Sequence, residues 1–415
     1  MYRQGLRVGA AVCLLSTFWS GIRLFDISIF EWLALLVIPC VWIYRPKEEG
    51  VALASFTLAG CGLALLAFAG IISSQSSFDP SEHILKVSKL ISALMLTIGL
   101  GYVLANRKIF NIVEVLYLLC LSAAACSLVA VLQGQLGILT GLIPRSGEGG
   151  IEDWTRMTGL AEHPIETGTV AAYGIAISLG LGLYLRKWWV LFFLIAVDAY
   201  SMRFSASLTA VFAFLIASVV LCLYAKAYKL LFFGGATGAL VIAAAVAVSP
   251  GSAGQLGDRL TSLYASAGNY RTVQSRAMQL QKTIDLIAPS TLALGNGYST
   301  SDLPYKKEIH NGLLASVFHF GVLGLLSQCF LIGFFAAKLR SGAPRGLKSI
   351  LLGCIVVFIL PYLSGPPQAR PSLWAPVMLL GAYLAIPKKD RLSSRPAPNF
   401  RPIIGPPGGI KQGNS

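Results

Sequence analysis

The sequence predicts an all-α fold: a polytopic membrane helix bundle of about twelve transmembrane helices, with two larger outer loops. Of 415 residues, 55% are hydrophobic and only 12% are charged, whereas a soluble domain carries about 25% charged residues. The mean hydropathy is +0.69. The apolar residues gather in long runs, and about 20 of them span a hydrocarbon core as a helix. These observations exclude a chain of soluble domains.

The predicted helices follow the apolar runs in order. The first run comes after Arg3 and Arg7 and lacks a small-x-small cleavage site, so we interpret it as a membrane span rather than a signal peptide. The seventh run is short for a core of about 30 Å and is expected to be tilted or broken. The expected spans are residues 6–22, 27–44, 51–73, 88–105, 110–133, 166–185, 188–202, 205–224, 229–248, 311–337, 348–364 and 372–387.

Charge divides the loops into two sets. Short basic loops alternate with the others along the chain, and the positive-inside rule places them, with both termini, in the cytoplasm. The larger loops, residues 134–166 and 249–310, and the short loop at 73–86 then face outward, which in a bacterial inner (plasma) membrane is the periplasm. The basic residues that define the inner loops are Arg3, Arg7, Arg45, Lys47, Arg107, Lys108, Arg186, Lys187, Lys226, Lys229, Lys338, Arg340, Arg345 and Lys348.

The chain divides into a membrane domain, residues 1–387, and a tail, residues 388–415. The tail is basic and then rich in Pro and Gly, which predicts a disordered cytoplasmic extension. The formal net charge is +15, and basic residues beside a membrane meet anionic headgroups. Membrane lipids are therefore the expected partner of this charge, and no nucleic-acid partner is predicted.

The outer loop at 249–310 is predicted to be partly helical. A helix resting on a membrane surface or on the rim of a bundle has apolar residues at spacings of three and four. Gly295-Asn296-Gly297 then predicts a tight turn. The apolar residues with this spacing are Val273, Ala277, Leu280, Ile284 and Ile287.

The eight cysteines all lie in apolar segments. This placement is typical of small buried hydrophobic residues rather than of disulfides or metal ligands. The sequence contains no CxxC and no HExxH motif. It therefore predicts neither a metal site nor a cofactor.

Arginine recurs on the predicted outer face, where the positive-inside rule disfavours it. Arginine makes bidentate, charge-assisted hydrogen bonds to phosphate, so a group of arginines beside a membrane favours a lipid-linked phosphate or pyrophosphate ligand. The alternative is contact with headgroups, or salt bridges to Glu148, Glu152, Asp153 or Asp258. The candidate phosphate-binding residues are Arg156, Arg203, Arg259, Arg271, Arg276 and Arg370.

Histidine placement narrows the search for a catalytic group. His310 and Asn311 lie at the mouth of a long apolar segment, directly after the largest polar loop. Imidazole titrates near neutrality, so His310 is the candidate general base, and a surface residue at a helix end is the alternative. His319 lies nine residues on, half a turn out of phase, and is expected to be a buried, hydrogen-bonded histidine. His163 precedes Pro164 and is either a ligand-binding residue or a helix cap.

Two acidic residues fall at or near membrane depth. Asp198 lies within the seventh run and Glu166 begins the sixth. Ionisable groups at this depth are costly and are usually paired or functional. Arg203, five residues after Asp198, is the nearest cation in the sequence, and Glu166 also suits the N-terminus of a helix.

Over roughly residues 50–385, these features resemble the O-antigen ligase and polysaccharide polymerase superfamily of bacterial membrane glycosyltransferases. The strongest likeness is His310-Asn311 followed by Gly321-x-x-Gly324. Arg156-x-x-Gly159 with His163-Pro164, Gly295-Asn296-Gly297-Tyr298, the number of spans and the large outer loop before the tenth span add to it. In that superfamily an acidic residue often lies two positions before the first of those glycines, where this chain has His319.

The resemblance implies a metal-independent, inverting glycosyltransferase acting at the periplasmic face. Its donor is a glycan on undecaprenyl pyrophosphate. Its acceptor is a sugar hydroxyl, on lipid A–core for a ligase of lipopolysaccharide synthesis, or on another lipid-linked repeat for an O-antigen or exopolysaccharide polymerase. His310 is then the catalytic base. The named arginines, His163 and Asn311 bind pyrophosphate or glycan.

Three classes of function remain open on the sequence. A transferase is favoured, with the ligase slightly ahead of the polymerase. A transporter or flippase of lipid-linked sugar predicts polar residues along the membrane midplane and inverted repeats, whereas here the polar residues gather at one face. A membrane scaffold without chemistry is the third class, and loss of transfer on changing His310 in a folded protein would exclude it.

Overall fold

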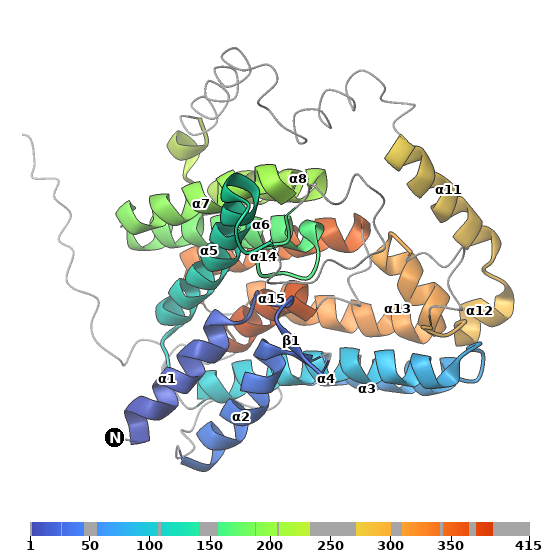
Figure 1. The fold of residues 1–415 in the computed structure, drawn as a ribbon. Coiled ribbons are helices and arrows are strands. Elements are labelled where there is room, and N and C mark those ends of the chain that lie inside the picture. The colour runs from blue at the N-terminus through green and yellow to red at the C-terminus, as the bar shows by residue number, and fades with distance from the viewer. Residues whose placement is uncertain are drawn as a thin grey trace, which may run out of the picture.

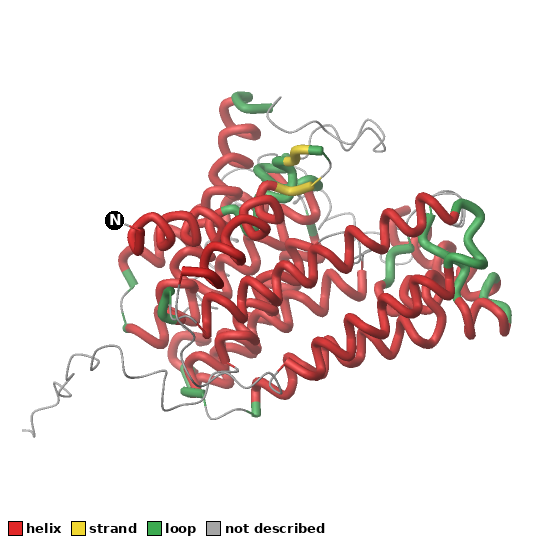
Figure 2. Tube along the Cα trace, turned by 90° about the horizontal axis from the view of Figure 1, so that it is seen from below, coloured by secondary structure: helices red, strands yellow, loops and turns green. Residues whose placement is uncertain are grey.

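The computed structural model describes residues 2–25, 27–44, 56–106, 109–140, 157–186, 188–205, 207–232, 271–299, 309–340, 343–364 and 371–384. Within these ranges the regular secondary structure is helical apart from a small hairpin of β1 (Arg23–Leu24) and β2 (Ile27–Ser28). Figure 1 shows the helices as one bundle, and Figure 2 shows the hairpin at its edge. The sequence-based prediction of an all-α membrane protein is confirmed at this level.

The helices occur in the order that the apolar runs predict. The first group is α1 (Tyr2–Leu15), α2 (Ile29–Tyr44), α3 (Thr57–Ser73), α4 (Pro80–Asn106), α5 (Ile112–Leu136), α6 (Pro164–Leu185), α7 (Trp189–Ser205) and α8 (Leu208–Ala225). The second group is α11 (Arg271–Asp285), α12 (Pro289–Leu294), α13 (Gly312–Leu339), α14 (Arg345–Ser364) and α15 (Pro371–Leu384).

Six helices in the described ranges are long and apolar enough to cross a membrane: α4, α5, α6, α8, α13 and α14. Shorter apolar helices fall within α1, α2, α3 and α15. The protein is therefore membrane-embedded, while the count of about twelve spans stays a prediction. Of the expected ninth span, only residues 229–232 lie in the described ranges.

Helix ends follow local chemistry. Asn111 and Glu114 form a capping box at the start of α5, in which each side chain accepts a hydrogen bond from the other residue's backbone N–H. The expected span at 6–22 is too long as a single helix, because α1 ends at Leu15. There the hydroxyls of Ser16 and Thr17 donate to backbone carbonyls three residues earlier, at 2.8 and 2.7 Å. Such local bonds compete with helical ones.

Small residues let the helices approach closely, as in membrane bundles generally. Helix α6 is buried along most of its length and packs against α5, α7, α8 and α14. A Cβ added to Gly180 of α6 would lie 2.3 Å from Ile350 of α14. Helix α13 packs on α3, where the Ser327 hydroxyl donates to the Gly62 carbonyl at 2.7 Å.

Contacts between distant segments sort the helix ends into two sets. At the end that the charge pattern predicts to be cytoplasmic, Arg7 of α1 pairs with Glu114 of α5, and Arg345 of α14 donates to the Tyr224 carbonyl at 2.6 Å. At the opposite end, Ser20 accepts from the Glu162 backbone N–H at 3.2 Å. Each of the first two contacts therefore joins segments beside two basic loops of the same predicted set.

The cysteines are free, as predicted, but not all are buried. Cys40, Cys61 and Cys329 are exposed on the outside of the bundle, whereas the other five are buried. In a membrane protein the outer surface of the bundle faces lipid, which is as apolar as the core. Apolar sequence context therefore does not distinguish a core cysteine from a lipid-facing one.

Candidate functional site

The mouth of α13 carries the strongest sequence motif. Asn311 is the N-cap, and its side chain accepts from the Leu314 backbone N–H at 3.0 Å. His310, one residue earlier, is half-buried. Beside it, Ile309 belongs to a small apolar cluster with Phe318 against which Ile287 packs. The cap and this cluster fix the backbone on both sides of His310.

Helix α13 is broken nine residues beyond its mouth. Gly321 has φ 64° and ψ −162°, a conformation outside the helical region that L side chains rarely adopt. The Phe318 and His319 carbonyls accept hydrogen bonds from the backbone N–H groups of Asn296 and Gly297, at 2.7 and 3.1 Å. The turn after α12 thus satisfies carbonyls that an unbroken helix would bond four residues ahead.

Two glycines permit this close approach. A Cβ on Gly321 would lie 2.6 Å from the Ala293 carbonyl oxygen, and one on Gly295, which has φ +79°, would lie 2.4 Å from the His319 carbonyl oxygen. The predicted tight turn at Gly295-Asn296-Gly297 is an irregular segment whose backbone N–H groups bond to α13; residues 295–298, called the turn here, are docked into the break of α13. Figure 1 shows α11 and α12 at this end of the bundle, beside the α3–α4 connection.

His319 is buried, as the sequence predicted, and it belongs to the docked turn. Its Nδ1 donates to the Gly297 carbonyl at 2.6 Å, because a carbonyl oxygen only accepts. Its ring lies against Tyr298, with the ring centroids 4.7 Å apart. His319 therefore stabilises the turn, and it occupies the position where the resembled superfamily often has an acidic residue.

His83 also holds this turn, a role that no motif in the sequence indicates. Its Nδ1 accepts from the Tyr298 backbone N–H at 2.6 Å, and its Nε2 lies 2.8 Å from the Gly70 carbonyl of α3. The side chain is fully buried.

At the start of α4, hydrogen bonds from the Ser81 hydroxyl and the Glu82 backbone N–H hold the pKa of Asp79 below its ordinary value.

A second group of predicted residues lies at the ends of α6 and α7. The Met157 backbone N–H donates to the Phe204 carbonyl at 3.0 Å, which ties the segment after Arg156 to the end of α7 beside Arg203. Arg203 is exposed, with its guanidinium 5.9 Å from the centre of the Phe204 ring. Arg203 is therefore accessible to a ligand at this end of the bundle.

Gly159 approaches the protein itself rather than open space. It has φ +60°, and an added Cβ would lie 2.4 Å from the Cys126 carbonyl oxygen of α5. The Gln133 side-chain amide bonds to both backbone groups of Gly159: it accepts from the N–H at 2.9 Å and donates to the carbonyl at 3.3 Å. The glycine of Arg156-x-x-Gly159 thus anchors this segment to α5.

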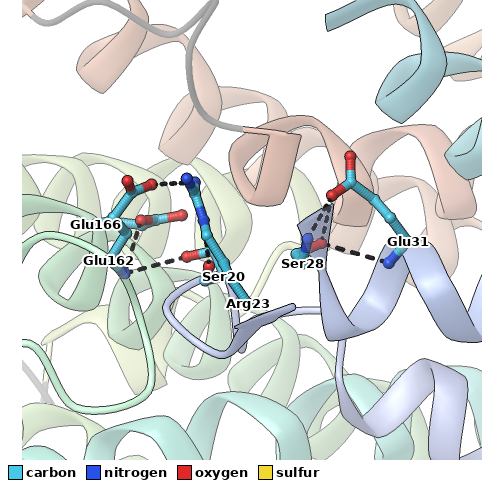
Figure 3. A network of polar contacts seen from close by, with 6 residues as sticks. All are labelled: Ser20, Arg23, Ser28, Glu31, Glu162 and Glu166. Carbon is cyan, nitrogen blue, oxygen red and sulfur yellow. Dashed lines mark hydrogen bonds and ion pairs between the residues drawn. The ribbon is translucent and has the colours of Figure 1, made fainter. Parts of the chain in front are cut away.

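His163 acts as the N-cap of α6. Its Nδ1 accepts from the Ile165 backbone N–H at 3.1 Å, and Pro164 occupies the first helical turn. Figure 3 shows the neighbouring polar network, in which Arg23 pairs with Glu162 and the Glu162 backbone N–H donates to the Glu166 carboxylate at 3.3 Å. Glu166 is thus a buried acid at a helix N-terminus, where the helix dipole favours negative charge.

The same figure shows how the hairpin passes into α2. Glu31 accepts from the Ser28 backbone N–H at 2.8 Å and from its hydroxyl at 2.7 Å. These bonds fix the first turn of α2 next to the Arg23–Glu162 pair. Polar side chains therefore join the segment between α1 and α2 to the residues just before α6.

Asp198 lies deep in the bundle and away from Arg203. Both carboxylate oxygens are buried, and the Ser127 hydroxyl of α5 is their polar neighbour. One of them occupies the space that a Cβ on Gly174 of α6 would need, 2.0 Å from that position. Arg203, the nearest cation in the sequence, is exposed, and no ion pair joins it to Asp198 in the described part of the chain.

The remaining predicted arginines are only partly placed. Arg271 and Arg276 lie in α11, a helix within residues 249–310. Within it Leu280 and Ile284 are exposed, and Ile287 lies beyond the helix end. Arg156, Arg259 and Arg370 lie outside the described residues, as do Glu308 and the tail at 388–415.

Helices α14 and α15 lie between the two groups. The Ser316 hydroxyl, one turn inside α13, is 3.4 Å from the Tyr362 hydroxyl of α14. The Tyr173 hydroxyl of α6 donates to the Leu373 carbonyl of α15 at 2.7 Å. The mouth of α13 and the N-terminal half of α6 thus face the same pair of helix ends.

The arrangement offers a half-buried imidazole at a helix mouth and an exposed guanidinium on the same side of the bundle. Within the described ranges, no three His, Cys, Asp or Glu side chains are grouped as a metal ion would require. Comparison with protein-family models gives no match. Comparison with curated proteins gives no match either.

Proposed function

We propose that this protein transfers a glycan from undecaprenyl pyrophosphate to a sugar hydroxyl at the periplasmic face of a bacterial inner membrane. The observation that carries the proposal is His310-Asn311 followed by Gly321-x-x-Gly324, with Asn311 as the cap of α13 and His310 half-buried at its mouth. We place this imidazole at the boundary between the aqueous phase and the membrane, because the apolar helix α13 begins two residues after it. That combination suits an acceptor in water and a donor anchored in lipid.

The proposed chemistry needs a base and a stabiliser of negative charge. His310 accepts the proton of the acceptor hydroxyl while that oxygen bonds to the anomeric carbon and the bond to pyrophosphate breaks. The leaving pyrophosphate gains charge, and guanidinium groups stabilise it without a metal cation. Arg203 supports this role by its exposure at the same end, and Arg156 by its place next to Met157.

Within this class we propose a ligase, which joins the glycan to lipid A–core, and keep an O-antigen or exopolysaccharide polymerase as the alternative. The acceptor distinguishes them. A transporter or flippase of lipid-linked sugar is the more distant alternative, and the motif at the mouth of α13 favours the transferases over it.

The surface glycan of a strain lacking this protein tests the proposal. A ligase predicts that lipid-linked polymer accumulates while lipid A–core stays bare, and restoring the wild-type chain restores long glycan. Single repeats on lipid A–core identify a polymerase instead. An unchanged glycan profile together with unchanged lipid-linked intermediates would contradict both.

A further inference from the structure

We propose that His83 is a positioning residue: its imidazole holds the Gly295–Tyr298 turn in the break of α13 and so sets where His310 lies. The inference rests on the proposed function for its catalytic consequence. The contact itself, between Nδ1 of His83 and the backbone N–H of Tyr298 at 2.6 Å, does not depend on it.

The hydrogen bonds fix the tautomer of His83. The Tyr298 backbone N–H only donates, so Nδ1 carries no proton. Nε2 then carries the proton and donates to the Gly70 carbonyl at 2.8 Å, with the Ser73 hydroxyl at 3.3 Å. A single neutral imidazole near the start of α4 therefore connects α3 to the Gly295–Tyr298 turn. Because His83 is fully buried, each of these bonds is costly to lose.

The turn is held from its other side by α13. The Phe318 and His319 carbonyls accept from its backbone, and the His319 ring donates to Gly297. Lys86, one turn after His83, lies 5.5 Å from the Tyr298 ring centre and pairs with Glu82 at 2.9 Å. The turn thus forms a link between α4 and the first segment of α13.

The link continues to the mouth of α13. The turn leads back through α12 to Ile287, which packs on the cluster of Ile309 and Phe318. Ile309 is the neighbour of His310, and Phe318 supplies a carbonyl to the turn. A shift of the turn therefore reaches His310 by two routes, one through Ile287 and Ile309 and one through Phe318. A displacement of about 1 Å at a catalytic group costs about 100-fold in rate.

Two substitutions separate positioning from simple support of the bundle. In His83→Asn the amide reaches the place of Nδ1, so it accepts from Tyr298 and loses the bond to Gly70. In His83→Gln the amide reaches the place of Nε2, so it donates to Gly70 and loses the bond to the turn. The two variants are matched in burial and polarity, and they differ in which partner they keep.

The readouts are steady-state glycan transfer and a distance between spin labels on full-length protein. Labels at Ser88 of α4 and Leu313 of α13 report on the mouth, with exposed Cys40, Cys61 and Cys329 changed to Ser. We expect His83→Gln to lower kcat about 100-fold at unchanged KM and to shift the label distance. His83→Asn should stay close to wild type in both. Equal behaviour of the two variants, or an unchanged distance in His83→Gln, overturns the proposal.

Two further outcomes are also decisive. If wild-type protein transfers no glycan, the proposed function fails. The positioning role is then decided by the label distances in His83→Gln and His83→Asn alone. If His83→Gln does not fold, His319 takes its place: His319→Asn keeps a donor for Gly297 and His319→Gln loses it. A distance shift confined to His319→Gln supports the link, and matching distances overturn it.

Discussion

At the residue scale, the candidate residues are held either by their neighbours in the chain or by segments far away in the sequence. The cap role of His163, one of its two predicted roles, and the buried, hydrogen-bonded state of His319 follow from their own neighbourhood in the chain. His83 does not, because its partner Tyr298 lies 215 residues away. Gly159 was identified, but its close approach is to Cys126 of α5, again a distant residue that no local pattern reveals.

The first residue-scale prediction concerns Arg203. If its guanidinium binds pyrophosphate through two parallel bonds, Arg203→Lys keeps the charge but loses the geometry. We expect donor affinity to fall about tenfold or more, measured as KM for the lipid-linked glycan. Arg156→Lys should behave alike. Arg340→Lys, at the opposite end of the bundle, is the control and should leave KM unchanged. Unaltered KM and kcat in Arg203→Lys would reduce Arg203 to a surface cation.

At the element scale, most helices were predictable within a few residues, while their interruptions were not. The expected spans at 110–133 and 166–185 correspond to α5 (Ile112–Leu136) and α6 (Pro164–Leu185). Apolar runs and caps carry that information locally. The break at Gly321 was not predicted, because glycine is common in membrane helices. Only the turn at 295–298, docked from elsewhere in the chain, shows that this glycine ends a helical segment.

The element-scale prediction compares two glycines of α13. Gly321→Ala forces a side chain into a left-handed conformation and toward the Ala293 carbonyl, so it should destabilise the protein by about 1–3 kcal/mol. Gly333→Ala is the control, since its added Cβ meets nothing within 4 Å and alanine favours helix. Melting temperatures in detergent give the comparison. A Gly321→Ala protein as stable as Gly333→Ala would contradict the break.

At the scale of the whole molecule, charge and hydropathy predicted the class of the protein, and long-range contacts place the candidate residues. Hydropathy predicted a membrane bundle because the thickness of the bilayer sets the length of the apolar runs that cross it. The two groups at α13 and α6 come to the same side through α14 and α15, in contacts such as that between Tyr173 and Leu373. Those contacts depend on packing between segments far apart in sequence, which periodicity does not encode.

The orientation of the bundle is the first whole-molecule prediction. Charge sorting places α12 outside and the basic loop after α8 inside. In protein whose exposed cysteines are changed to Ser, Ser290→Cys should react in intact cells with a thiol reagent that cannot cross the inner membrane. Lys229→Cys should react only after that membrane is opened. The reverse pattern would invert the topology and remove the site from the periplasm.

The central claim is that His310 is the base of a metal-independent glycan transfer. The most direct measurement is the initial rate of transfer from purified lipid-linked glycan to acceptor by purified protein, with EDTA present. His310→Ala should lower this rate about 100- to 10,000-fold, with its melting temperature and donor binding unchanged. Gln75→Ala, an exposed substitution at the same end, should match wild type. A folded His310→Ala protein that transfers glycan at a near-normal rate would contradict the account.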